Sequence, residues 1–472
     1  MGKLRTDHRF GNCQVELPVS ATASTAAAAP KKISAAKAVP NQAVSLLRNL
    51  IWLYLILWLI EGGLRRWFLP GLASPLLLVR DPLVIAIYFL AAANNLFPTN
   101  GFIIWGAVLG LLTFLNAILL GHGNLFVALY GVRCDFLHVP LIFIIGKVLR
   151  QRDLLALARI AVWISVPFTM LLVAQFYQPQ EAWVNRGVGG DMAGAGFDGA
   201  LDRFRPPGTF SFITGPALLY PLFTACWFAL LIAKKFSLPM MIASGAAILV
   251  TIPISISRTL FLAVLIVAAA GIAGLVAGGR FSLKLVAQFA VVAVLLYLLA
   301  GQSHIFSDGM EAFTARWDAA TTDQGGFKEA IVDRVLEGFF GAFGSVRGAG
   351  CGTGFSTNVG QQLATAHLGF GAAEAEWGRL LYDNGFVLGS LLIAYRITLV
   401  GTILFAAIRA WQRRSPIALM FAAACLLTVL NGQWGQTTTL GAAAIGGGLA
   451  LAAAKPEAKM KKISAAPKPS AA

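Results

Sequence analysis

The sequence predicts an all-α, polytopic integral membrane protein, a bundle of about twelve transmembrane helices with a long extracytoplasmic loop between helices 9 and 10. Hydrophobic residues make up 57% of the 472 residues and charged residues only 12%, whereas about 25% charged residues is ordinary for a soluble domain. The mean hydropathy is +0.73. The 49 glycines fit helices that pack closely in lipid, where small residues let backbones approach one another. A soluble globular fold is therefore excluded.

The two ends of the chain differ from the rest in composition. Residues 1–44 are rich in Ala, Ser, Pro and Lys and lack the apolar run of a signal peptide, so we expect a disordered cytoplasmic tail. Residues 454–472 form a similar basic tail, which repeats the phrase KKISAA of residues 31–36 at residues 461–466. The lysines are suited to contact anionic membrane lipid, and solvated charge is the alternative interpretation.

Between the tails, apolar stretches of roughly the 20 residues needed to cross a bilayer recur along the chain. Helices 1–9 are expected within residues 45–300 and helices 10–12 within 385–453. The candidate spans are 46–61, 75–93, 102–120, 136–149, 155–177, 210–233, 238–256, 259–277, 283–300, 385–408, 416–431 and 436–453. Residues 121–133 are interpreted as a loop or a re-entrant piece.

Basic residues orient these spans, because cytoplasmic loops of membrane proteins collect Lys and Arg. The clusters on one side are Arg150/Arg152, Lys234/Lys235, Arg280/Lys284 and Arg409/Arg413/Arg414. They predict that both termini are cytoplasmic. The segments that then face outward are 62–74, 121–135, 178–209, the turn at Arg258 and 301–384. Topology thus accounts for much of the formal charge of +16, and we expect no nucleic-acid partner.

The segment 301–384 is long enough to expect a function for it. Within it, Phe327, Ile331, Val335 and Phe339 recur at helical spacing and predict an amphipathic helix on the membrane surface. The glycine-rich run 348–360 is interpreted as a flexible loop or as backbone N–H groups that contact a phosphate or sugar.

The end of the same segment carries AEAEWGRLLYDNG. Its residues Glu376, Arg379 and Asp383 have the i, i+3, i+7 spacing of an ion-pair ladder on one helix face. Glu374 lies on another face, where a carboxylate is either a general base or a solvated surface group.

Arginines suggest an anion site on the outer side. Arg203 and Arg205 precede a Pro-Pro-Gly turn that opens a membrane helix, and Arg258 lies in a very short turn between two spans. Guanidinium groups match phosphate oxygens in a bidentate manner. Arginines that snorkel to lipid headgroups are the alternative.

Arg80 lies inside a candidate span beside Asp81. An ionisable residue within a span indicates a function, and structural pairing with neighbouring helices is the alternative.

The five cysteines and five histidines are scattered and show no metal-binding spacing, so no metal is expected. Cys134 and Cys351 both fall on the outer side, and whether they form a disulfide is left open.

Four pieces of sequence resemble the superfamily of O-antigen polymerases and O-antigen ligases, which are glycosyltransferases of the bacterial envelope. They are EGGLRRWFLPGLASPLLLVRDPL at 61–83, RFRPPGTFSFITGP at 203–216, SISR at 255–258 and EWGRLLYDNGFVLG at 376–389, with the glycine-rich run between the last two. The pieces occur in the order expected for the family, and the long outer loop falls late in the chain.

The resemblance implies an enzyme of the inner membrane in exopolysaccharide or O-antigen biosynthesis. Arginines of the family hold a polyprenyl-diphosphate-linked glycan while an acceptor hydroxyl attacks the anomeric carbon with inversion, without metal or cofactor. The residues that correspond are Arg203 or Arg205, Arg258 and, more weakly, Arg80. Membrane lipids, a chain-length regulator and export machinery are the implied partners.

One departure concerns the catalytic base. Many relatives carry a His-Asn pair about where Glu374-Ala375 stand here. The base is therefore Glu374, a displaced His367, or absent. The missing His favours a polymerase of lipid-linked repeat units over a ligase that transfers the glycan to another acceptor. An anion transporter or flippase and an inactive membrane subunit are the alternatives from other classes. The sequence does not specify the sugar, the linkage, the acceptor or the oligomeric state.

Overall fold

The computed structural model describes residues 41–192, 194, 197–277, 304–323, 348–357, 359–360, 375–413 and 415–456. All of them belong to a single compact unit. Both predicted tails, apart from a few residues at their inner ends, lie outside the described residues. So do the predicted span 283–300 and the predicted amphipathic helix at Phe327–Phe339.

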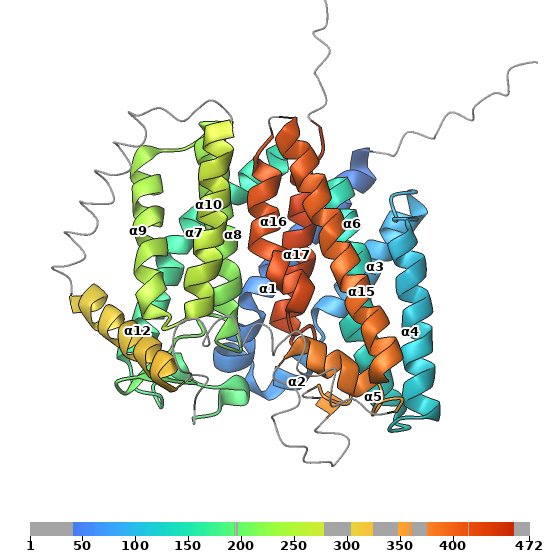
Figure 1. The fold of residues 1–472 in the computed structure, drawn as a ribbon. Helices are drawn as coiled ribbons and strands as arrows, with labels where there is room; N and C mark the ends of the chain where they lie inside the picture. The colour runs from blue at the N-terminus through green and yellow to red at the C-terminus, as the bar shows by residue number, and fades with distance from the viewer. Residues whose placement is uncertain are drawn as a thin grey trace, which may run out of the picture. The chain divides into compact units, whose positions relative to one another are not determined.

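The described part of the chain is mostly helical, as predicted (Figure 1). The α-helices are α1 Asn41–Gly63, α2 Ala73–Leu76, α3 Arg80–Ala93, α4 Gly101–Leu119, α5 Leu125–Val132, α6 Val139–Val148, α7 Gln151–Tyr177, α8 Thr214–Ala233, α9 Leu238–Ile254, α10 Arg258–Ala277, α12 His304–Asp323, α15 Glu376–Gln412, α16 Ile417–Asn431 and α17 Thr437–Ala453. Two π-helical turns, η1 Leu64–Phe68 and η3 Arg133–Leu137, and three 3₁₀ turns, η2 Pro70–Leu72, η4 Trp183–Asn185 and η5 Val188–Gly190, connect them. The strands β1 Phe197–Ala200 and β2 Arg203–Arg205 form an antiparallel hairpin.

Within the described residues, 8 helical segments are long and apolar enough to cross a bilayer, and the shorter apolar helices α9, α16 and α17 accompany them. The molecule is therefore a helical membrane protein. Of the residues 121–133 interpreted as a loop or re-entrant piece, 121–124 form a connection, whereas 125–133 are helical, because α5, η3 and α6 run on as one helical segment, Leu125–Val148, that is long and apolar enough to cross a bilayer. The π-helical turn η3 lets this helix continue where Arg133 and Asp135 enter the bundle.

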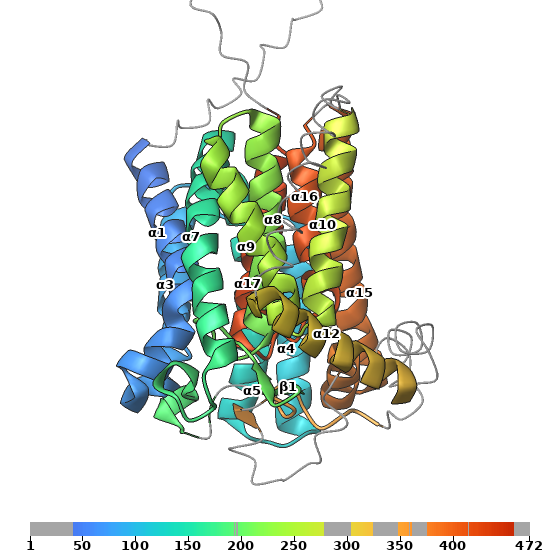
Figure 2. The same ribbon diagram turned by 90° about the vertical axis from the view of Figure 1, so that its left-hand side faces the viewer.

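The connections gather at two ends of the bundle (Figures 1 and 2). One end, called the hairpin end here, carries the β1–β2 hairpin, α12, the α9–α10 turn, α2 and the first part of α15. The opposite end carries the α8–α9 turn, the start of α7 and the α15–α16 connection. This grouping agrees with the predicted sidedness, and which end faces the cytoplasm stays a prediction.

Small residues let the central helix α17 pack on all sides, against α6 and α16 among others. A Cβ atom added at Gly446 would lie 2.4 Å from Cys425 Cβ, and one added at Gly448 would lie 2.6 Å from Ile145 Cβ. Only glycine fits at such approaches. The expectation that glycines serve close helix packing is confirmed here.

Candidate anion site and the buried ionic network

Three arginines from distant segments approach one another at the hairpin end. Arg205 is the last residue of β2, Arg258 is the first residue of α10, and Arg316 lies in α12. Burial of the Arg205 guanidinium, together with the positive charges of Arg316 and Arg258, lowers the pKa of Arg205 to about 10. Its Nε atom is buried without a hydrogen bond to any described residue. We call these three residues the Arg205 cluster.

The turn after β2 fixes the position of Arg205. Gln175 clamps Gly208, since its Oε1 accepts from the Gly208 amide at 2.7 Å and its Nε2 donates to the Gly208 carbonyl at 3.0 Å. Arg66 donates to the carbonyls of Gly208 and Phe210 at 2.8 and 3.1 Å. The side chains of α7 and η1 thus hold the Pro-Pro-Gly turn that the sequence singled out.

The hairpin also contacts the turn between α9 and α10. A Cβ atom added at Gly199 would lie 2.6 Å from Ile256 Cδ1 and 3.5 Å from Arg205 Cγ. Ile256 has a φ angle of +47°, which is strained for a β-branched residue and costs roughly 1–3 kcal/mol. The turn is as short as predicted, because α9 ends at Ile254 and α10 begins at Arg258.

Helix α12 completes the cluster from the other side. Arg316 Nη1 donates to the Gly199 carbonyl at 2.9 Å, and Asp308 lies 4.0 Å from Arg203 and accepts from the Tyr177 hydroxyl at 3.0 Å. Arg203, which lies two residues before Arg205, therefore pairs with α12. Sequence reasoning missed Arg316, because it is an isolated arginine in a long polar segment.

Arg80 has a different environment from the Arg205 cluster. Its side chain is buried, and its three nitrogens donate to Glu61 Oε2 at 2.8 Å, to the Tyr54 hydroxyl at 3.3 Å and to the Thr437 carbonyl at 2.5 Å. Asp81 accepts from Arg133 Nε and Nη2, both at 2.8 Å. The interpretation that Arg80 and Asp81 pair with neighbouring helices is confirmed, and a ligand role for Arg80 stays a prediction.

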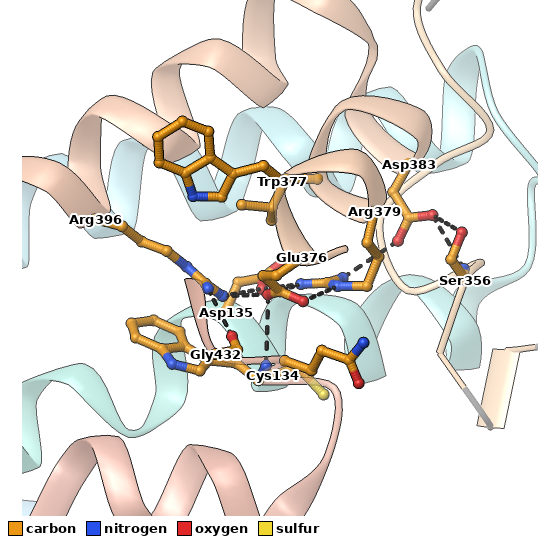
Figure 3. Close-up of polar contacts among 12 residues, drawn as sticks. Cys134, Asp135, Ser356, Glu376, Trp377, Arg379, Asp383, Arg396 and Gly432 are labelled. Carbon is orange, nitrogen blue, oxygen red and sulfur yellow. Dashed lines mark hydrogen bonds and ion pairs between the residues drawn. The ribbon is translucent and has the colours of Figure 1, made fainter. Parts of the chain in front are cut away.

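A second buried group of charges lies where α15 begins (Figure 3). Arg379 contacts Glu376 at 2.9 Å, Asp383 at 3.3 Å and Asp135 at 2.8 Å, and Arg396 contacts Glu376 at 2.5 Å. The predicted ladder of Glu376, Arg379 and Asp383 is therefore confirmed. We call these five residues the Arg379 network. Every member is almost fully buried.

The described part of the glycine-rich run packs against this network. Gly350, Gly352 and Gly354 have φ angles of +81°, +103° and +86°, which favour glycine. The Gly352 amide donates to the Asp383 carbonyl at 2.6 Å, and Ser356 donates to the Asp383 carboxylate through its amide and its hydroxyl. These amides are already used within the protein, so the run is a packed segment and the expectation of a flexible loop is wrong for the described residues.

The two candidate bases, Glu374 and His367, lie outside the described residues, and their roles stay predictions. Cys134 and Cys351 are both free cysteines, so the structure has no disulfide between them. Within the described ranges, no group of three or more His, Cys, Asp or Glu side chains is arranged to hold a metal ion.

No protein-family model matches this sequence, and no curated protein matches it.

Proposed function

We propose that this protein is a membrane glycosyltransferase that polymerises polyprenyl-diphosphate-linked oligosaccharide units at the outer face of the bacterial inner membrane, with inversion and without metal. The observation that supports this most is the convergence of Arg258 and Arg316 on the poorly solvated guanidinium of Arg205. In this proposal the bundle has twelve spans, both termini are cytoplasmic, and residues 301–384 and the hairpin end face outward.

The Arg205 cluster is suited to a diphosphate. Burial and the neighbouring positive charges make the protonated form of Arg205 energetically costly. An anion bound between the arginines offsets this cost. Arg258 opens α10, so the positive end of the helix dipole adds to the same field. The planar forks of guanidinium groups match the spacing of phosphate oxygens.

The same geometry favours catalysis of glycosyl transfer. When the acceptor hydroxyl attacks the anomeric carbon, the bond to the diphosphate breaks and negative charge develops on the leaving oxygen. Arginines that are already held in place stabilise this charge in the transition state. Arg205, Arg258 and, beside them, Arg203 are assigned to the diphosphate. Glu374 or His367 takes the proton from the acceptor hydroxyl if a base is used.

The test is reconstitution with a lipid-linked repeat unit, followed by native mass spectrometry and product analysis. The wild-type protein is expected to retain a polyprenyl-diphosphate glycan and to lengthen it. The Arg205→Ala/Arg258→Ala variant is expected to lose both properties. The Arg152→Ala variant, which removes an exposed arginine at the opposite end, is the matched control. Transfer to a different acceptor without chain growth would replace polymerase by ligase, and no bound glycan lipid in the wild type would contradict the proposal.

A further inference from the structure

A cavity of about 410 Å³ is lined by residues of α7 and of the α8–α9 turn. Figure 1 shows this turn at the end of the bundle opposite the hairpin. Arg159 and Trp163 of α7 line one side, and Lys235, Phe236 and Ser237 of the turn line the other. The cavity contains none of the residues assigned to glycosyl transfer.

The polar part of this cavity is positively charged. Arg159 and Lys235 enter it from two different segments, and none of the described residues that line it is acidic. Arg159 uses only Nε in its hydrogen bond to its own helix, to the Leu155 carbonyl at 3.3 Å. Its two terminal nitrogens, Lys235 Nζ and the Ser237 hydroxyl are donors, and none of the side chains that line the cavity is a carboxylate that would pair with them. Such a set fits a phosphate group.

The remaining wall is apolar and runs from the buried side chains of Val162 and Leu230 to exposed side chains on the outer surface of the bundle. Val162, Leu230 and Met240 line it, and Trp163 and Leu238 beside it are 66% and 63% exposed. On a membrane helix, side chains with this exposure face lipid, and tryptophan is typical of the interface with water. The acyl chains of a phospholipid whose phosphate is bound here would therefore lie along α7 and α9.

We propose that this cavity is a binding site for an anionic phospholipid, with the phosphate between Arg159 and Lys235 and an acyl chain along Trp163 and Met240. Basic pockets between membrane helices bind anionic headgroups, and the α8–α9 turn carries one of the clusters predicted to be cytoplasmic. The site does not depend on the proposed function.

The experiment is native mass spectrometry of the detergent-purified full chain, titrated with phosphatidylglycerol or with phosphatidylcholine. The wild-type protein is expected to retain one phosphatidylglycerol in preference to phosphatidylcholine. In Arg159→Gln/Lys235→Gln the phosphatidylglycerol affinity is expected to fall roughly tenfold or more. The control Arg152→Gln/Lys234→Gln removes two charges at the same end from residues that do not line the cavity, and it is expected to bind like the wild type.

Each other outcome would overturn the proposal. Equal retention of both lipids would show an apolar cleft without headgroup selection. Unchanged phosphatidylglycerol affinity in Arg159→Gln/Lys235→Gln would show that the lipid binds at a different site. Displacement of the lipid by millimolar inorganic phosphate would identify a free-anion site in place of a lipid site.

Because all four substituted residues are exposed, the melting temperature without added lipid is expected to match that of the wild type, which separates lost binding from misfolding.

Discussion

Arg379 Nη2 donates to Asp135 Oδ1 at 2.8 Å, and both side chains are almost completely buried. This contact joins the first turns of α15 to the π-helical turn η3. Arg379 also holds Glu376 and Asp383, so one guanidinium serves three buried carboxylates. Arg396 is the second cation of the network.

Replacing Arg379 with Ala is expected to destabilise the protein by about 3–5 kcal/mol, because the buried carboxylates lose their main partner. Thermal unfolding in detergent measures the loss. Arg409→Ala near the other end of α15 is the control, since Arg409 is exposed, and its effect is expected to stay below about 1 kcal/mol. Equal melting temperatures for the two variants would contradict a central role for the Arg379 network.

Arg258→Ala is expected to reduce glycosyl transfer roughly a hundredfold, as loss of one preorganised donor costs about 3 kcal/mol in the transition state. Single-turnover measurements with a lipid-linked repeat unit report this loss. Arg152→Ala is expected to keep wild-type turnover. Near-normal turnover in Arg258→Ala would remove Arg258 from the site.

Inorganic diphosphate is expected to raise the melting temperature of the wild type and to raise that of Arg205→Ala much less. The pKa of Arg205 is lowered to about 10, so at pH 8 the residue is still protonated and its charge is opposed by Arg316 and Arg258. A bound anion offsets this opposition and stabilises the folded state by mass action. The stabilisation is expected to weaken as the pH rises through about 10, because Arg205 then loses its proton in the anion-free protein. A shift of equal size in both proteins would place the anion elsewhere.

Gly131→Ala is expected to destabilise the protein by about 1–3 kcal/mol. An added Cβ atom would lie 2.4 Å from the Gly354 amide nitrogen and 2.6 Å from the Thr353 carbonyl carbon, and backbone atoms cannot move aside cheaply. Gly401→Ala is the matched control, because nothing lies within 4 Å of its added Cβ atom. That change is expected to be neutral or to stabilise α15 slightly. If the two variants unfold alike, the glycine-rich run is not packed on α5.

The features that the sequence predicted well are local ones. The long apolar helices of the described residues follow from apolar length, while the count of twelve spans stays a prediction, and the ladder of Glu376, Arg379 and Asp383 follows from helical spacing within one segment. The partners Asp135 and Arg396 could not be predicted in this way, because they join the ladder only through tertiary packing. Arg316 was missed for the same reason.

The glycine-rich run shows why composition alone misleads. Its glycines predicted mobility or contact with a ligand, whereas Gly352 and Ser356 bind Asp383. Nothing local to the run identifies that acceptor. Conversely, the short α9–α10 turn was predicted correctly, since the two apolar runs leave almost no residues between them.

The contact between Arg379 and Asp135 also has a consequence for biosynthesis. The two residues are 244 positions apart, so at about 5–20 residues per second the ribosome makes Asp135 roughly 10–50 s before Arg379. During that interval the helix that carries Asp135 is already made, while the arginine that pairs with its carboxylate does not yet exist. The first half of the bundle therefore reaches its final charge pairing only when α15 arrives, and a nascent chain that stops before Glu376 carries Asp135 without its two arginine partners, Arg379 and Arg396.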